Sequence, residues 1–500
     1  MEIVMKNQLL RGALILTVAG FVTRLIGFGY RIFLADELGE VNLGIYQLIF
    51  PVYSICFTIY AAGIQTAVSQ MISHNSPQKQ GSILKTSLIL SLICSLSLSC
   101  AVHLFRVPIA NKFLGTRQAG ELLGILAYIF PFCGITSVIN GYFYGINRAK
   151  IPAVTQIIEQ LVRVIFVFAV CFSFDTNEKS VYIAVLGLVI GELCSNIYNI
   201  YHVKKHISMR ILLQSKLCIG KILRLSLPLS GTKLVIALLG SIESILIPVI
   251  MQRYGYSVEV SIGLYGILTG VVLPFILFPG TITNSLSVLL LPAIAKASGT
   301  NNRRQIRSTS SLTVRYSLLL GVLTSSLFLN FGVEIGQFIF HSENAGKLLT
   351  VMAFLCPFLY VTTTLGSIIN GLGKTGITFL FTVIGLLVRI LFLLFIAPHF
   401  GIYGYIMGML ISQILICLLH GGYLLKTNQV PCNLSKYFVW PMIFSCSVMY
   451  FSKIAGMQII AKTGNNIVVL ASMIPAVLLI LLYFFMFHLV SRQDFKVKKY

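Results

Sequence analysis

Six basic side chains lie within hydrophobic segments of this chain, and they are the residues best placed to do chemistry. A charge at the centre of a membrane helix costs about 2.5–3.5 kcal/mol on insertion scales, so it is retained mainly where it has a function or a partner. These cations outnumber the acids in similar segments, Glu159, Glu192, Glu243 and Glu334. A membrane cavity with excess positive charge favours an anionic or phosphate-bearing cargo over a cationic drug or a metal ion. The six cations are Arg24, Arg31, Arg163, Lys233, Arg315 and Arg389.

Arg24 and Arg31 are seven residues apart in the first hydrophobic segment. Two helical turns place them on one face of a helix, about 10 Å apart along its axis. Each guanidinium offers a planar set of donors that fits phosphate oxygens. Arg24 lies near the middle of its segment and is the stronger cavity candidate. For Arg31, nearer the outer end, the alternative is that its side chain extends to the membrane surface.

Glu159 and Arg163 are four residues apart, with the acid first, which is the favourable order for an ion pair within one helix. We expect them to neutralise each other and to hold their helix in the bundle. Arg389 is the counterpart of Arg163 in an internal repeat described below, but Gly385 replaces the acid there. Arg389 must therefore contact another helix, through Glu192 or Glu243, or the cargo itself.

The remaining charged residues are assigned by position. Lys233 and Glu243 share one segment but are ten residues apart, so they are expected on different faces. Glu192 lies at the centre of its segment, where a carboxylate can bind a proton or Na⁺ and couple transport to an ion gradient. The alternative for Glu192 is a hydrogen-bonded packing residue. Arg315 is one turn inside its segment, where extension of the side chain to the surface is the favoured interpretation.

The composition of the chain is that of a membrane protein, so membrane-spanning helices are expected to position these residues. Of 500 residues, 57% are hydrophobic and only 10% are charged, and repeated apolar stretches of about 20 residues are typical of transmembrane helices. The chain is therefore expected to be an all-α, polytopic membrane protein with about fourteen spans. The spans are expected near 9–35, 43–73, 83–105, 121–146, 152–174, 181–203, 222–250, 262–294, 312–340, 347–372, 377–397, 401–424, 436–455 and 466–489.

The distribution of charge excludes several classes of function. The net charge of +23 comes from basic residues between the apolar segments, a pattern of membrane topology rather than of nucleic-acid binding. Basic residues are concentrated at both termini and in the even-numbered connections, which places both termini in the cytoplasm. The 11 cysteines show no metal-ligand spacing. No catalytic or nucleotide-binding signature fits its required context, so we expect neither an enzyme nor a cofactor.

The chain also repeats itself at an offset of 226 residues. Pro131-Phe132 recurs as Pro357-Phe358, and Leu161-Val162-Arg163 recurs as Leu387-Val388-Arg389. Each repeat unit spans six helices, so both units have the same orientation, which is a transporter architecture with a site between the halves. We expect lobes at 1–210 (helices 1–6) and 211–430 (helices 7–12). Residues 431–500 then hold helices 13–14 and a basic cytoplasmic tail.

Several sequence stretches resemble one known family. Thr23-Arg24-Leu25-Ile26-Gly27-Phe28-Gly29-Tyr30-Arg31 resembles the opening helix of the flippases for lipid-linked oligosaccharides, which include the stage V sporulation protein B group and the lipid II flippases. Leu43-Gly44-Ile45-Tyr46-Gln47 resembles the start of their second helix. Leu273-Pro274 to Phe278-Pro279 and Leu291-Pro292-Ala293-Ile294 resemble helix 8 of the sporulation group.

The resemblance implies two six-helix lobes forming a V, related to the multidrug and toxic compound extrusion transporters. It also implies alternating access, in which a pyrophosphate-sugar head crosses a cationic cavity while the lipid tail stays in the bilayer beside helices 13–14. Arg24 matches an arginine needed for transport in that family. On this basis Arg24 and Arg389 would bind pyrophosphate, and Lys233 would add positive potential. Lipid II itself is less well supported, because a further cavity arginine of lipid II flippases has no clear match in helix 8.

The expected function is movement of an undecaprenyl-pyrophosphate-linked saccharide, a cell-wall precursor, across the bacterial cytoplasmic membrane, with a role in sporulation. Coupling would use H⁺, Na⁺ or the membrane potential. The expected partners are the lipid-linked oligosaccharide, membrane lipids and wall-synthesis proteins, and the expected oligomeric state is a monomer. Two alternatives remain, a cation-coupled multidrug exporter on the same fold and a non-transporting scaffold of a wall-synthesis complex.

Overall fold

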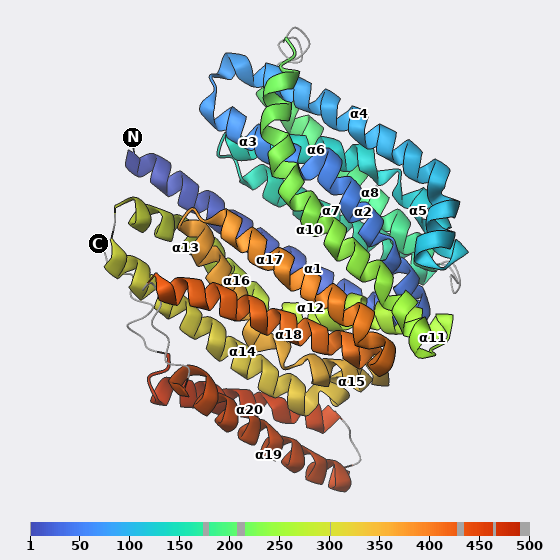
Figure 1. The fold of residues 1–500 in the computed structure, drawn as a ribbon, viewed down its shortest axis with the longest axis vertical. Helices are drawn as coiled ribbons and strands as arrows, with labels where there is room; N and C mark the ends of the chain where they lie inside the picture. Colours follow the sequence, from blue (N-terminus) through green and yellow to red (C-terminus); the bar gives the residue numbers. More distant parts are fainter. Residues whose placement is uncertain are drawn as a thin grey trace. The chain divides into compact units, whose positions relative to one another are not determined.

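The structure, a computed structural model, is helical throughout the parts of the chain that it describes (Figure 1). These parts are residues 2–173, 180–207, 216–300, 302–427, 435–463 and 467–490. Contacts divide the chain into two units, Met1–Gly266 and Ile267–Tyr500. This division follows packing, whereas the lobes expected at 1–210 and 211–430 follow the repeat, and those lobe boundaries stay a prediction.

The first unit is built from long helices and the shorter pieces that interrupt them. In chain order these are α1 (Glu2–Leu48), α2 (Phe50–Phe57), the π-helical turn η1 (Thr58–Ala62), α3 (Gly63–His74), α4 (Pro77–Ile109), η2 (Ala110–Leu114), α5 (Arg117–Leu126), α6 (Ile129–Gly145), α7 (Lys150–Ser173), α8 (Ser180–His206), α10 (Ile219–Tyr254) and α11 (Val258–Gly266).

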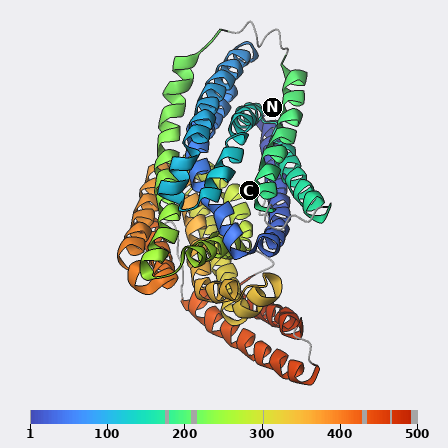
Figure 2. The same ribbon diagram turned by 90° about the vertical axis from the view of Figure 1, so that its right-hand side faces the viewer.

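The second unit continues in the same manner and ends with the two additional helices expected at the C-terminus, α19 and α20, which lie side by side (Figures 1 and 2). Its elements are η4 (Ile267–Val272), α12 (Leu273–Leu277), α13 (Gly280–Gly299), α14 (Arg303–Ile339), α15 (Glu343–Met352), α16 (Leu355–Gly371), α17 (Thr375–Phe395), α18 (Ala397–Lys426), η5 (Ser435–Val439), α19 (Trp440–Thr463) and α20 (Ile467–Met486).

The helices have the lengths that a membrane requires. Eleven described helices are long and apolar enough to cross a bilayer, or thirteen if each of two bent helix pairs forms one crossing. The first stretch, Ile15–His74, has 60 residues, about 90 Å of helix against a hydrocarbon core of about 30 Å. It therefore covers the first two expected spans. Gly39 breaks it with φ of 69° and ψ of 174°, a conformation that favours glycine.

The internal repeat is confirmed at the level of individual helix ends. The pair α5 and α6 is bent by 44°, and the pair α15 and α16 by 57°. The ends of the second pair match those of the first at the offset of 226 residues. Thr116 caps the first pair by accepting from the Ala119 amide, and Ser342 caps the second by accepting from the Ala345 amide. The same local sequence signals therefore build the same bent span twice.

Each unit has a corresponding apolar core. In the first, buried residues of α3, α4 and α6 pack together, including Val68, Leu84 and Phe143. In the second, buried residues of α13, α14 and α16 do so, including Leu318 and Ile369. Phe143 and Ile369 are again 226 residues apart. These cores hold the helices that carry the charged residues.

Candidate functional site

The first candidate residue, Arg24, is exposed on the long helix α1. It makes no hydrogen bond or ion pair within the described residues. Its neighbours Phe21, Val22 and Leu25 are exposed as well, and all three are apolar. A guanidinium that faces lipid near the centre of a membrane carries a large penalty, so we expect this surface of α1 to face water or an anion.

Arg31 lies two turns further along the same uninterrupted part of α1, as predicted from the spacing. It is exposed on the surface of the unit, and unlike Arg24 it interacts with other described residues. Phe33 of α1 stacks on Phe168 of α7 with ring centroids 4.0 Å apart, which fixes α1 against the helix that carries Arg163. Arg24 and Arg31 therefore differ in environment, although they share one helix.

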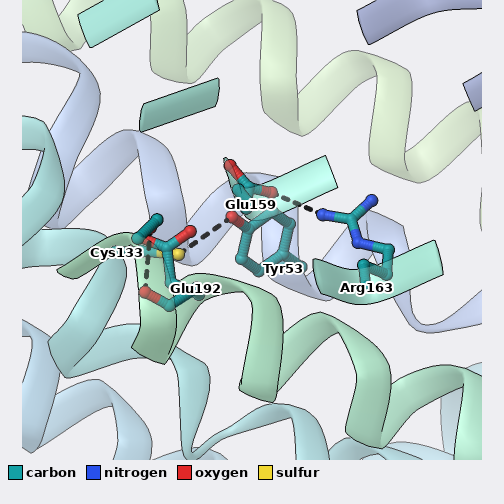
Figure 3. Close-up of polar contacts among 6 residues, drawn as sticks. Tyr53, Cys133, Glu159, Arg163 and Glu192 are labelled. Atoms are coloured by element: carbon teal, nitrogen blue, oxygen red, sulfur yellow. Dashed lines mark hydrogen bonds and ion pairs between the residues drawn. The ribbon is translucent and has the colours of Figure 1, made fainter. Parts of the chain in front are cut away.

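Glu159 and Arg163 form the ion pair predicted within α7, with 2.5 Å between Oε1 and Nη2 (Figure 3). The Arg163 side chain is 17% exposed and that of Glu159 is 28% exposed. Because the pair is internally neutral, it adds little net charge to the interior of the first unit. We assign it a structural role, in agreement with the expectation from the spacing.

Glu192 of α8 lies beside this pair in the same close-up (Figure 3). It is 5% exposed, and its Oε1 atom accepts no hydrogen bond from the described residues. Nearby, the Tyr53 hydroxyl and the Cys133 sulfur are 3.4 Å apart. One turn along α8, the Asn196 amide donates to Thr136 Oγ1 at 2.8 Å. Glu192 therefore differs from Glu159, which is paired with Arg163.

Lys233 and Glu243 of α10 have different surroundings, as their spacing predicts. The ammonium of Lys233 donates to the Ala62 carbonyl at 2.8 Å and to Thr66 Oγ1 at 3.1 Å. Glu243 is 5% exposed within α10. A sequence cannot reveal that Lys233 bonds to a backbone carbonyl, because the bond depends on how two distant helices pack.

Arg389 of α17 is half-buried in the second unit. The absence of an acid at position 385 has a packing reason, because a Cβ at Gly385 would lie 2.2 Å from Ile416 Cδ1 of α18. Any side chain at position 385 would require Ile416 to change its conformation. The expected contact of Arg389 with Glu192 or Glu243, which belong to the first unit, stays a prediction.

Arg315 contacts two aromatic rings. Its guanidinium lies 5.4 Å from the ring centre of Tyr316 and 5.7 Å from that of Tyr437. These are cation–π distances, and Tyr437 belongs to η5. Arg315 therefore joins α14 to η5, and its extension to the membrane surface stays a prediction.

The sequence did not reveal a second ion pair. In the structure Lys453 lies within α19 and its ammonium is 2.7 Å from Glu334 Oε1 of α14. It also donates to the Asn330 carbonyl at 2.6 Å. The two side chains are 21% and 13% exposed. This pair ties α19 to α14 within the second unit.

Replacing only Glu334 by leucine is expected to destabilise the protein by about 3 kcal/mol, because Lys453 would remain buried without its carboxylate. Adding Lys453→Met should recover most of that stability, since an apolar pair of similar size replaces a buried ion pair at little cost. Thermal unfolding of the purified variants in detergent measures both effects. A double variant as unstable as the single one would contradict this assignment.

The comparisons with known proteins agree with this architecture. Residues 9–298 match the family described as "Polysaccharide biosynthesis protein". The chain belongs to this family. Residues 241–395 also match the MatE family. As a member with many membrane-spanning helices, the chain is a multi-pass membrane protein.

Two curated relatives cover different shares of the chain. It is 28% identical to "Stage V sporulation protein B" of Bacillus subtilis (strain 168), over 98% of both chains. It is 26% identical to "Lipid II flippase MurJ" of the same organism, over 34% of this chain and 33% of that one. Among solved structures, lipid II flippase MurJ in an inward closed conformation superimposes with a TM-score of 0.73 at 17% identity, covering 95% of this chain and 99% of that one.

A second solved structure shows how widely this fold is shared. An inward-facing multidrug resistance MATE family transporter matches with a TM-score of 0.61 at 16% identity, covering 82% of this chain and 95% of that one. At such identities the likeness establishes the fold alone. The expected fold, an all-α membrane protein of the polysaccharide and multidrug transporter type, is confirmed. The position of the termini in the cytoplasm stays a prediction.

Proposed function

We propose that this protein is a flippase that moves an undecaprenyl-pyrophosphate-linked saccharide from the cytoplasmic to the outer leaflet of the cell membrane. The observation that carries the proposal is the exposed and unneutralised Arg24 on an otherwise apolar surface of α1. Support also comes from membership of the polysaccharide biosynthesis family and from the relatives named for a sporulation protein and a lipid II flippase.

The positive charge of Arg24 is costly inside a membrane. An arginine at this depth is tolerated if its helix surface lines a water-filled path, and an anion entering that path gains charge-assisted hydrogen bonds from the guanidinium. A pyrophosphate matches the paired donors of arginine, and a polyprenyl tail does not need to leave the lipid. Arg24 is therefore proposed to bind pyrophosphate, with Arg31 on the same helix contributing further contacts, and the pyrophosphate-binding role expected for Arg389 stays a prediction.

Glu192 is proposed to couple transport to a gradient of H⁺ or Na⁺. It is buried, has an oxygen without a hydrogen-bond donor among the described residues, and is not neutralised by an ion pair of its own. Glu159 is less suited to this role because it is already paired with Arg163. Membrane potential is the alternative energy source for moving a charged head group.

Replacing Glu192 by glutamine is expected to remove the dependence of transport on an imposed ion gradient, because the amide keeps the size of the side chain but cannot exchange a proton or hold a charge. Transport would be measured in vesicles with and without a pH or Na⁺ gradient. Glu121→Gln, which changes an exposed acid in α5, is the matched control. A gradient response of Glu192→Gln equal to that of the wild type would exclude Glu192 from coupling.

A cation-coupled multidrug exporter is the second candidate, favoured by the MatE match and by the MATE family structures. Such an exporter would need acids along its drug path. Helix α1 has no acid between Glu2 and Asp36, and it presents Arg24 instead. Export of cationic dyes by cells that express the chain would support this candidate.

A non-transporting scaffold of a wall-synthesis complex is a further alternative. In that case cell-wall synthesis would stay intact when Arg24 is changed.

Complementation tests the proposed function. The chain would be produced in a bacterium depleted of its own lipid II flippases, with membrane insertion confirmed. Growth would establish lipid II as one cargo. Absence of growth would exclude lipid II and direct the search to another lipid-linked saccharide, such as a precursor used only during sporulation.

A further inference from the structure

The second hydrophobic span of the first unit contains a structural irregularity that is held by a charged side chain. Helices α2 and α3 are joined by the π-helical turn η1, Thr58–Ala62. The carbonyl of Ala62, the last residue of η1, accepts from Lys233 Nζ at 2.8 Å and from Thr66 Oγ1 at 3.1 Å. Lys233 also donates to Thr66 Oγ1 at 3.1 Å. One ammonium therefore holds the end of the π-turn.

A helical carbonyl oxygen has two lone pairs, so the Ala62 carbonyl can accept from side chains as well as from the helix. It does so at the end of the π-helical turn, where bonding to the fifth residue gives way to bonding to the fourth. Single π-turns of this kind occur frequently at functional sites and at helix kinks. The lysine thus bonds at the point where this span is most easily bent.

Helix α10 is seated closely against this turn. A Cβ at Gly63 would lie 1.8 Å from Ser230 Oγ and 2.9 Å from the Ser226 carbonyl, so only glycine permits the approach. Further along, Ser241 Oγ donates to the Pro51 carbonyl at 2.9 Å. Helix α10 therefore contacts the second span at several points, and Lys233 supplies a charged hydrogen bond there.

The partners of Lys233 have no charge of their own. They are a carbonyl and a hydroxyl, and the residue remains exposed. The bond from the Lys233 ammonium to the Ala62 carbonyl is charge-assisted on the donor side only, whereas a bond to a phosphate oxygen adds attraction between two opposite charges. A phosphate oxygen that reaches Lys233 therefore competes effectively with the Ala62 carbonyl.

We propose that Lys233 is an anion-sensitive latch. Its ammonium holds the π-turn of the second span while no anion is bound, and it transfers to a phosphate oxygen when the cargo arrives, which frees the turn to rearrange. This inference rests on the proposed function, because it takes the pyrophosphate of the cargo as the anion. A ligand can drive a conformational change only if it binds one state more tightly than the other. An anion can contact Lys233 only after the ammonium has left the Ala62 carbonyl, so it favours the state in which the π-turn is free.

Hydrogen exchange of the backbone amides in residues 58–66 tests the latch in the purified full-length protein in lipid nanodiscs. Inorganic pyrophosphate at about 10 mM is the probe, compared with sodium chloride of equal ionic strength. In the wild type, pyrophosphate should speed exchange in this segment roughly tenfold, the effect of losing one charge-assisted bond. In Lys233→Met, exchange should already be fast and should not respond to pyrophosphate.

Three further variants separate the latch from simple packing. Lys233→Arg keeps a cationic donor and should retain the pyrophosphate response. Thr66→Val removes one neutral acceptor of the Lys233 ammonium. This variant should also retain the pyrophosphate response, because the Ala62 carbonyl remains. Arg224→Gln, an exposed cation on the same helix, should behave as the wild type.

The outcomes distinguish the latch from the proposed function. Slow exchange in both the wild type and Lys233→Met would overturn the latch, whatever the cargo is. Fast exchange in Lys233→Met, together with a pyrophosphate response in the wild type that Lys233→Arg preserves, would support it. If the latch behaves in this way while no lipid-linked saccharide is transported, the proposed function fails and the anion-sensitive contact stands.

Discussion

Replacing Arg24 with alanine is expected to abolish transport of the lipid-linked saccharide, with a loss of about 100-fold, while the protein still inserts and folds. The magnitude is that of removing a charge-assisted donor from a site where charge must be stabilised. Folding should be unaffected, because Arg24 is exposed and has no hydrogen bond or ion pair within the described residues. Growth of a flippase-depleted strain, at equal protein levels, measures the effect.

The matched controls separate charge from geometry. Arg24→Lys keeps the charge but loses the planar pair of donors, so it should retain part of the activity. Arg117→Ala removes an exposed arginine at the start of α5 and should have no effect. Normal growth with Arg24→Ala would show that the exposed surface of α1 is not the path of the cargo.

The second large effect is expected at Gly44, where two helices of the first unit meet. A Cβ at Gly44 of α1 would lie 2.1 Å from the Ile262 carbonyl oxygen of α11, and a Cβ at Gly266 would lie 2.3 Å from the Gly44 nitrogen. Small residues let membrane helices approach at the level of the backbone. Gly44→Leu must therefore separate α1 from α11, and we expect a destabilisation of about 3 kcal/mol or more.

Gly20→Leu is the control for this prediction, because it lies on the same helix and a Cβ there meets no atom within 4 Å. Both variants would be compared by the yield and thermal unfolding of protein extracted in detergent. Equal stability of the two variants would mean that the close contact of Gly44 with Ile262 does not hold these helices together.

Much of the fold can be predicted from the sequence because its strongest signals are local or repeated. Apolar stretches of sufficient length specify the spans, and the return of Pro131 and Arg163 as Pro357 and Arg389 identifies the two equivalent halves. The structure adds that the break within the bent span recurs in register as well. The ion pair of Glu159 with Arg163 is equally local, since four residues of helix bring the two together.

The remaining contacts could not be predicted, because they depend on which helix faces meet. Lys453 pairs with Glu334 from a helix more than a hundred residues away, and Arg315 lies against Tyr437 of η5. Lys233 bonds to a backbone carbonyl, which no side-chain pattern reveals. A membrane helix with several small and polar residues can present more than one face to its neighbours, so helical periodicity alone does not select the partner.

The most direct test of the central claim is a translocation assay with the purified protein in liposomes. An undecaprenyl-pyrophosphate-linked saccharide with a fluorescent group on the sugar would be quenched from outside to follow its movement between leaflets. The account predicts translocation by the wild type, near-background movement by Arg24→Ala, and competition by unlabelled pyrophosphate-linked saccharide. Translocation at the same rate by the wild type and Arg24→Ala, or none by the wild type with any saccharide of this class, would contradict it.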